Sequence, residues 1–235
     1  EVGAPALSAA MNGMSSWIIA YGMIGSGKTF SITGTPLDPG ICTRLFNDVF
    51  ERSRSRSCLQ CDVTVSVSYF EIHNDKARDL VKGFTPFSSD GREKLTASRT
   101  NHELVKGLSE HDMMKFKEAG DSIRKKSFHR LNPRSSRSHT VFSIHFEVAK
   151  RGASGRQDRG PACGEVSQGS LHLVDLAGFE DFSESSFGDM EEEQLLETAA
   201  INKSIGALRI VLNKLASRQR CHVPYESCLL TKVLQ

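Results

Sequence analysis

The feature that most constrains this chain is a glycine-rich octapeptide, Gly22-Met23-Ile24-Gly25-Ser26-Gly27-Lys28-Thr29. It fits the pattern G-x-x-x-x-G-K-[ST]. An apolar run at 17–21 precedes it and predicts a buried strand, and a helix can begin at Lys28. Glycines let the backbone bend so that successive N–H groups converge on an anion, and a helix N-terminus adds positive potential. The octapeptide therefore predicts a phosphate-binding loop between a strand and a helix.

Two residues at the end of this loop would carry its chemistry. Lys28 would reach the β- and γ-phosphates of a nucleotide, and the Thr29 hydroxyl would coordinate Mg²⁺. A glycine turn that binds no ligand is the plain alternative, which the flanking strand and helix disfavour. The loop alone indicates a nucleotide and leaves the reaction open.

Two later segments are suited to contact the γ-phosphate. Residues 171–175 form an apolar run that ends in Asp175, and Gly178 follows three residues later. An acid at a strand end can hold the hydration shell of Mg²⁺, and the glycine offers an N–H to the γ-phosphate. The other segment, residues 132–139, reads Asn-Pro-Arg-Ser-Ser-Arg-Ser-His. Taken alone, the acid after residues 171–174 is a common ending of a buried strand. Residues 132–139, taken alone, indicate a solvated basic turn, which is the interpretation that composition favours.

Hydrophobic periodicity predicts strands mixed with helices. The predicted strands lie at 17–21, 62–70, 140–148 and 171–176, and the predicted helices at 41–50, 109–118 and 195–215. Ser109 and Asp112 have the spacing of a capping box. Polar or glycine-rich stretches predict surface loops at 51–60, 151–169 and 179–193. This mixture predicts an α/β sheet that is covered on both faces.

The composition sets the broad class. The 235 residues include 30 Lys and Arg against 28 Asp and Glu, and 38% are hydrophobic, which is ordinary for a globular protein. The near-neutral charge removes the simplest argument for nucleic-acid binding. The longest apolar stretch, Trp17 to Gly25, is too short to span a bilayer. Six cysteines fit a reducing compartment, and the pair Cys58 and Cys61 lacks the further ligands of a zinc site.

Taken in order, these segments resemble the motor domain of the kinesin family. Residues 20–29 are close to the family's A-Y-G-Q-T-G-S-G-K-T. The motif N-x-x-S-S-R-S-H, called switch I, is complete at 132–139, and D-L-A-G-S-E, called switch II, appears at 175–180 as Asp-Leu-Ala-Gly-Phe-Glu. Further matches lie at 68–74, 201–204 and 222–225, so that the resemblance covers essentially the whole chain.

The resemblance implies a three-layer α/β P-loop NTPase fold, in which helices flank a central mixed, largely parallel sheet. It implies an ATPase that converts ATP and water to ADP and phosphate, with ATP or ADP and Mg²⁺ as the bound groups and with stimulation by microtubules. The residues that would hold the nucleotide are Gly22, Gly25, Ser26, Gly27, Lys28, Thr29, Phe30 and Asn132.

The resemblance also implies the metal and catalytic residues. Mg²⁺ would be held by Thr29, Ser136 and, through a water, Asp175. Ser135 would contact the γ-phosphate region, and the Gly178 amide would sense the γ-phosphate. Arg137 and Glu180 would pair when the switches close, which positions the attacking water. Phosphoryl transfer needs placement and charge stabilisation more than covalent chemistry, and every one of these groups is present in the sequence.

The face expected to bind microtubules departs from the family pattern. Tubulin's outer surface is acidic, so kinesins present Lys and Arg there. The family's V-P-Y-R-D-S-K-L-T appears at 223–231 with Glu226 and Leu229 at its two basic positions, and the loop after switch II is acidic. Like charges across an interface cost affinity. Basic residues remain on or just after the long helix, at Lys203, Arg209, Lys214, Arg218 and Arg220. Microtubules are the expected partner, through a face of reduced basic charge.

Other departures lie at the nucleotide loop and at the ends. Met23, Ile24 and Phe179 stand where the family has Gln, Thr and Ser, and Phe179 is expected to alter the mobility of switch II. Residues 1–235 are expected to be a partial motor domain that lacks the first strand, the last helix and the neck linker, with dimerisation through segments outside the chain. The expected location is the cytoplasmic, microtubule-associated cytoskeleton, the axoneme included.

Two functional hypotheses follow from these residues. The first is a microtubule motor driven by ATP hydrolysis. The alternative is a non-motile, kinesin-like nucleotide-binding component of a microtubule or axoneme assembly, which Glu226, Leu229 and the acidic loop favour and the intact switch residues oppose. An unrelated P-loop ATPase or GTPase has little support.

Overall fold

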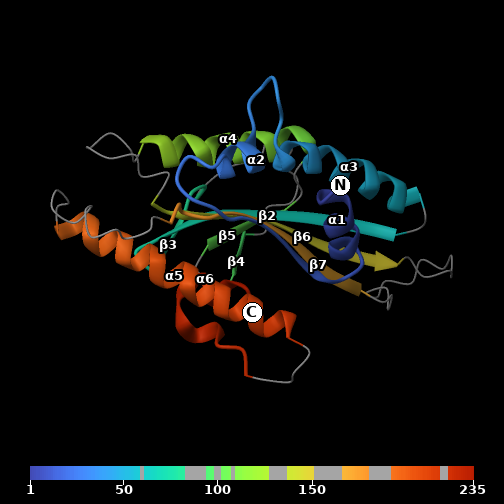
Figure 1. Ribbon diagram of the computed structural model, residues 1–235. Helices are drawn as coiled ribbons and strands as arrows, with labels where there is room; N and C mark the ends of the chain where they lie inside the picture. Colours follow the sequence, from blue (N-terminus) through green and yellow to red (C-terminus); the bar gives the residue numbers. More distant parts are fainter. Residues whose placement is uncertain are drawn as a thin grey trace.

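The computed structural model describes most of the chain. The described residues are 1–58, 61–82, 94–97, 102–106, 109–126, 137–150, 166–179, 192–217 and 222–235. They form a seven-stranded sheet with helices on both faces, which confirms the predicted α/β layers (Figure 1).

The central sheet runs in the order β1-β7-β6-β2-β5-β4, with β3 paired to β2. Its strands are β1 (Ser15–Ala20), β2 (Cys61–His73), β3 (Lys76–Asp79), β4 (Lys94–Ala97), β5 (His102–Lys106), β6 (His139–Lys150) and β7 (Val166–Asp175). The four predicted strands correspond to β1, β2, β6 and β7. Strands β3, β4 and β5 were not predicted.

The sheet is mixed, as predicted, but the expectation that it is largely parallel is wrong. Among the described strands, β1 and β7 pair in parallel, whereas β7–β6, β6–β2, β2–β3, β2–β5 and β5–β4 are antiparallel. Parallel neighbours need a crossover connection, whereas strands that follow one another in a hairpin must be antiparallel. Asn74 and Asp75, at φ 49° and 57°, form such a hairpin turn between β2 and β3.

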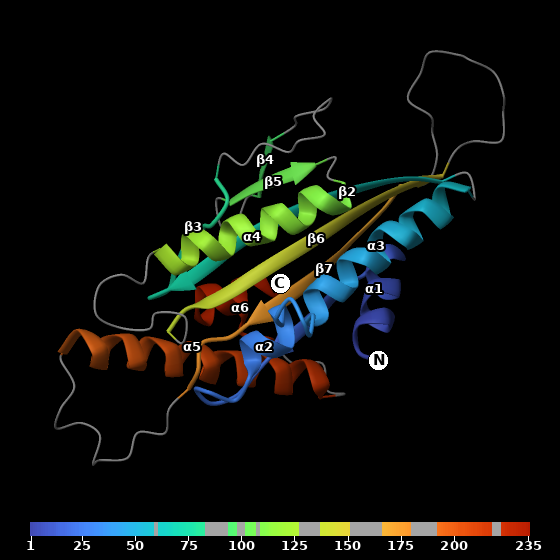
Figure 2. The same ribbon diagram turned by 90° about the horizontal axis from the view of Figure 1, so that it is seen from above.

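The helices form two layers around the sheet. One face carries α1 (Gly3–Met11), α2 (Lys28–Thr33), α3 (Ile41–Cys58) and α4 (Glu110–Lys126), and the other carries α5 (Glu192–Ala216), the short 3₁₀ helix at Tyr225–Ser227 and α6 (Leu229–Val233) (Figures 1 and 2). The predicted capping box opens α4, because the Ser109 Oγ accepts from the Asp112 N–H at 3.2 Å and the Asp112 carboxylate accepts from the Ser109 N–H at 3.1 Å.

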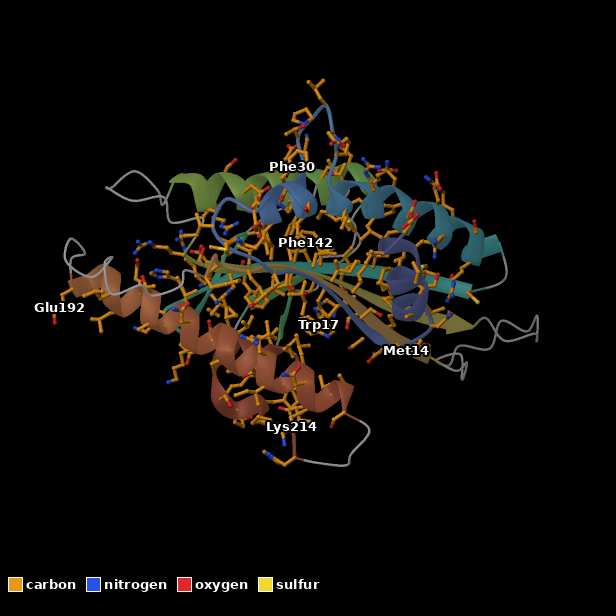
Figure 3. All side chains as sticks on the ribbon, in the orientation of Figure 1. Met14, Trp17, Phe30, Phe142, Glu192 and Lys214 are labelled. Atoms are coloured by element: carbon orange, nitrogen blue, oxygen red, sulfur yellow. The ribbon has the colours of Figure 1, made fainter. Side chains whose placement is uncertain are left out.

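The two faces of the sheet bury two separate hydrophobic clusters, because successive side chains of a strand point to opposite faces. Tyr69 and Phe142 pack under α3 and α4, whereas Phe70 and Val141, their neighbours in sequence, pack against α5 and α6. In Figure 3, Phe142 lies between the sheet and the upper helices and Trp17 lies below the sheet.

The loop predicted at 51–60 is wrong for most of its length, because α3 continues to Cys58. Its arginines make tertiary contacts that the sequence pattern does not show: Arg52 Nη1 donates to Ser8 Oγ and Arg56 Nη1 donates to the Met11 carbonyl, each at 2.6 Å. These bonds tie the C-terminal turns of α3 to α1. Within the described parts of the chain, none of the helices has the length and apolar character that a membrane crossing requires.

Candidate nucleotide-binding site

The predicted phosphate-binding loop lies between the end of β1 at Ala20 and the start of α2 at Lys28. Gly25 and Gly27 have φ of 78° and 86°, a left-handed conformation that other L-residues adopt only with strain. The Gly27 carbonyl accepts from the Ser31 N–H at 2.8 Å and so begins the ladder of α2. Within the loop the Ser26 N–H donates to the Met23 carbonyl at 3.3 Å. The structure therefore has the predicted glycine-rich turn between a strand and a helix start, the place where proteins commonly bind anions.

Lys28 lies against the loop that precedes it. Its ammonium donates to the carbonyls of Gly22 and Met23 at 2.9 and 2.7 Å. Burial lowers the pKa of Lys28, and the nearby Asp175 carboxylate opposes that shift. The positive charge is therefore centred over the loop, where the phosphates of a nucleotide would lie.

Thr29 and Asp175 come from distant parts of the chain and meet beside the loop. The parallel pairing of β1 with β7 places Ala20 opposite Asp175, so that the carboxyl ends of the two strands lie together. The Thr29 hydroxyl donates to Asp175 Oδ2 at 2.6 Å. Asp175 is 4% exposed, and its Oδ1 has no hydrogen-bond partner among the described residues. A hydroxyl and a buried carboxylate with a spare oxygen are the oxygen donors that Mg²⁺ requires.

Sequence analysis missed a buried arginine at this site. Arg124, on α4, places Nη1 at 3.5 Å from Asp175 Oδ2, and both side chains are less than 10% exposed. Its Nη2 also donates to the Ser138 carbonyl at 3.2 Å. Arg124 therefore links the strand end that carries Asp175 with the end of switch I. No motif marks it, since a single arginine in an amphipathic helix is ordinary.

Switch II lies directly on the loop crest. Phe179 forms an isolated parallel bridge with Met23, and its ring stacks on Tyr21 with centroids 5.1 Å apart. A Cβ built on Gly178 would overlap Ile24 Cγ1 and approach the Ile24 Cα and N to 3.0 Å. Positions 23, 24 and 179, where the loop and switch II depart from the family pattern, are thus brought together.

The switch I arginine is held by the long helix α5. Arg137 Nη1 donates to Glu197 Oε2 at 3.0 Å, and His73 Nε2 contacts Glu197 Oε1 at 2.8 Å. Burial raises the pKa of Glu197, but these partners outweigh it and hold the pKa below its usual value. Glu197 and His73 were not predicted to belong to the site. Both residues lie far from Arg137 in the sequence, so no motif connects them with it.

A buried histidine joins the two switches. His139 Nδ1 accepts from the backbone N–H of Ala177 in switch II at 3.0 Å, and its Nε2 lies 2.8 Å from the Ser204 hydroxyl on α5. Burial, and to a lesser extent the charge of Arg124, lower the pKa of His139 to about 4, so its ring is neutral near pH 7.

The remaining predicted residues divide into two groups. Ser26 is exposed in the loop. Phe30 is exposed on α2, where Figure 3 labels it. Asn132, Ser135, Ser136 and Glu180 lie outside the described residues. Their predicted roles, including the pairing of Arg137 with Glu180, therefore stay predictions.

The arrangement of the glycine-rich loop, Asp175 and the two adjoining switches agrees with the comparisons with known proteins. The model of the kinesin motor domain matches residues 1–235. The chain belongs to the kinesin family. Among curated kinesins, a kinesin-like protein of rice (Oryza sativa subsp. japonica), KIN-7L, is 35% identical over 97% of this chain. The chain spans 34% of the length of that relative.

Solved kinesin structures share the fold as well. A fast kinesin, described for its ATPase mechanism and its interactions with microtubules, aligns over 98% of this chain and 63% of its own, with a TM-score of 0.76 and 28% identity. A KIF14 dimer in complex with a microtubule aligns over 98% of this chain and 64% of its own, with a TM-score of 0.74 and 27% identity. These likenesses confirm the predicted kinesin fold.

Proposed function

We propose that this kinesin-family chain binds ATP with Mg²⁺ and hydrolyses it to ADP and phosphate. The observation that carries the proposal is the contact between Thr29 and Asp175 beside Lys28, because it brings the metal donors and the phosphate-binding charge to one place. Mg²⁺, when bound, neutralises the charge that develops on the phosphate oxygens. Ser136 is proposed as the further metal ligand.

The protein's own groups would bind, orient and shield the reacting phosphate. The loop amides and Lys28 hold the phosphate chain, and the Gly178 amide is close enough to the loop crest to report on the γ-phosphate. Arg137 is proposed to leave Glu197 and pair with Glu180 as the switches close, which positions a water with Ser135. Placement of this kind supplies most of the catalysis in phosphoryl transfer.

Steady-state phosphate release by the full-length protein tests this proposal. We expect ATP turnover that falls at least tenfold when EDTA removes Mg²⁺, because the charge on the transferring phosphate then lacks its counter-ion. Turnover that EDTA leaves unchanged would contradict the proposed metal site, and binding of ATP without phosphate release would contradict the proposed reaction.

Microtubules are the proposed partner, and the cytoplasmic microtubule array, including the axoneme, is the proposed location. The exposed cations Lys203, Arg209 and Lys214 all lie on α5, and Figure 3 shows Lys214 on the side of the molecule away from α2 to α4. A cationic helix suits the acidic surface of tubulin. The likeness to a kinesin solved in complex with a microtubule supports this assignment. Dimerisation is proposed to use segments outside the chain.

A substitution at Glu226 tests this surface. Glu226 Oε2 lies 2.9 Å from Lys232 Nζ, and this pairing raises the pKa of Lys232. The acidic residue thus adds a negative charge and also engages a cation. One charge contact is worth about 1 kcal/mol at 4 Å in water. Because that free energy is about fivefold in affinity, we expect Glu226→Arg to raise microtubule affinity about fivefold in a co-sedimentation assay at low salt.

The matched control makes the same change of charge on the opposite layer. Glu51→Arg alters an exposed residue of α3 and should leave the affinity unchanged. Equal gains in both variants would mean that net charge, rather than this surface, sets the affinity. The alternative function, a non-motile nucleotide-binding component of a microtubule assembly, is favoured by the Glu226–Lys232 pair and by Leu229.

A further inference from the structure

A buried series of hydrogen bonds crosses from switch II to α5 through His139. His139 is 3% exposed, Ala177 is 1% exposed and Ser204 is 8% exposed. The three residues come from three separate segments: the first residue of β6, the loop after β7, and the middle of α5. Water has little access to any of these bonds.

In this series of three hydrogen bonds, the donor and the acceptor of each bond are fixed. The Ala177 group is a backbone N–H and must donate, so His139 Nδ1 must accept. A neutral imidazole then carries its proton on Nε2, which donates to the Ser204 hydroxyl. The Ser204 hydroxyl in turn donates to the Ile201 carbonyl at 2.7 Å. No other arrangement of protons satisfies all three bonds with a neutral ring.

Ala177 lies at the centre of the predicted chemistry. Its amide is two residues after the metal-binding Asp175 and one residue before Gly178, whose amide is proposed to sense the γ-phosphate. At the other end, Ser204 lies one residue after the exposed Lys203 on the helix proposed to face tubulin. His139 therefore joins the described part of the switch II backbone to α5 through direct hydrogen bonds.

We propose that His139 is a positioning residue that couples the γ-phosphate sensor in switch II to α5 through Ala177 and Ser204. This inference rests on the proposed nucleotide site, but it needs nucleotide binding only and not turnover. When the Gly178 amide moves to meet a γ-phosphate, the adjoining Ala177 amide moves with it, and the buried bonds through His139 transmit that displacement to Ser204.

Hydrogen–deuterium exchange of α5 tests this coupling in the full-length protein. Exchange over residues 192–217 is compared with bound ADP and with a non-hydrolysable ATP analogue. In the wild type we expect a clear difference between the two states. Asn at position 139 can still accept from Ala177 but is too short to reach Ser204. Because one net hydrogen bond accounts for up to about a tenfold change in an equilibrium, we expect His139→Asn to reduce the difference fivefold to tenfold.

Variants at Ser204 test the same bond from the other side. Ser204→Ala should reduce the difference as His139→Asn does, and the double variant should add little, because both changes remove the same bond between His139 and Ser204. Ser204→Thr keeps the hydroxyl and should restore the response. These milder changes keep the test valid if His139→Asn folds poorly. Additive losses, or no loss in Ser204→Ala, would overturn the proposal.

A second buried histidine provides the matched control. His172 on β7 is 9% exposed and also contacts two serine hydroxyls, Ser143 and Ser170, each at 2.8 Å. Neither serine belongs to a switch. His172→Asn should lower stability and leave the α5 difference intact, and an equal loss there would show that destabilisation is the cause. Wild-type exchange that is identical in both nucleotide states would also overturn the proposal, whereas failure of the proposed reaction would appear only as absent phosphate release.

Discussion

Replacement of Gly178 with alanine is expected to lower ATP turnover about 100-fold, the usual cost of losing one preorganised backbone donor. The added Cβ would meet the backbone Cα and N of Ile24 at 3.0 Å as well as its side chain. Backbone atoms in the loop crest cannot retreat as a flexible side chain can, so the switch II segment must move. The Gly178 amide would then lose its place beside the γ-phosphate. Phosphate release by the full-length variant measures the effect.

ADP lacks the γ-phosphate, so ADP binding is expected to persist in Gly178→Ala. The matched control is Gly206→Ala in α5, because a Cβ at that position meets nothing within 4 Å. Alanine there gains up to about 1 kcal/mol of helix propensity and should leave turnover intact. Normal turnover in Gly178→Ala would contradict the assignment of this amide, and loss of ADP binding as well would mean that the whole loop has collapsed.

Replacement of Arg124 with methionine is expected to lower the free energy of unfolding by about 3 kcal/mol, because it leaves the buried Asp175 carboxylate without its cationic partner. The site offers a specific rescue: Mg²⁺ with ADP would place a new positive charge beside Asp175. The variant should therefore recover more stability from Mg·ADP than the wild type does. Urea denaturation with and without Mg·ADP measures both effects.

Arg44→Met is the control for this second prediction. Arg44 pairs with Asp38 at 3.2 Å, but the two side chains are 68% and 62% exposed. Water screens such a pair, so its loss should cost no more than about 1 kcal/mol. Equal losses in the two variants, or a loss in Arg124→Met that Mg·ADP does not relieve, would contradict the role given to Arg124.

The nucleotide site was predictable where local sequence dictates local conformation. The octapeptide has glycine at positions 25 and 27, where the turn requires a left-handed backbone, and Gly25 and Gly27 adopt that conformation in the structure. The apolar strand that ends in Asp175 was predicted for the same reason, since a short apolar run and a terminal acid are visible in the sequence. Family resemblance then indicated the two switches, and their described parts lie beside the loop and Asp175.

The rest of the site depends on contacts between distant segments. Arg124, Glu197 and His73 belong to ordinary amphipathic elements, and only the fold places them beside Asp175 and Arg137. The resemblance implied a largely parallel sheet, and the sequence pattern could not correct this, because periodicity reveals a strand but not its neighbour. Likewise, the polar and basic composition of residues 51–58 predicted a loop, because the sequence does not show the hydrogen bonds that Arg52 and Arg56 make to α1.

The charge reversal at Glu226 was visible in the sequence, but its consequence for Lys232 was not. The sequence shows an anion where the family has a cation, and the structure adds that this anion engages a remaining cation, Lys232, at 2.9 Å. This difference matters for the choice between a motor and a static component, because affinity for an acidic track depends on the cations left to face it.

The most direct test of the account is steady-state ATP turnover by the full-length protein, with and without polymerised microtubules, at low and moderate salt. We expect microtubules to stimulate turnover, and we expect the stimulation to weaken with salt, since exposed lysines and arginines would carry the contact. Turnover that microtubules do not change would contradict the motor assignment and favour the non-motile alternative. Absence of turnover in all conditions would contradict the proposed ATPase itself.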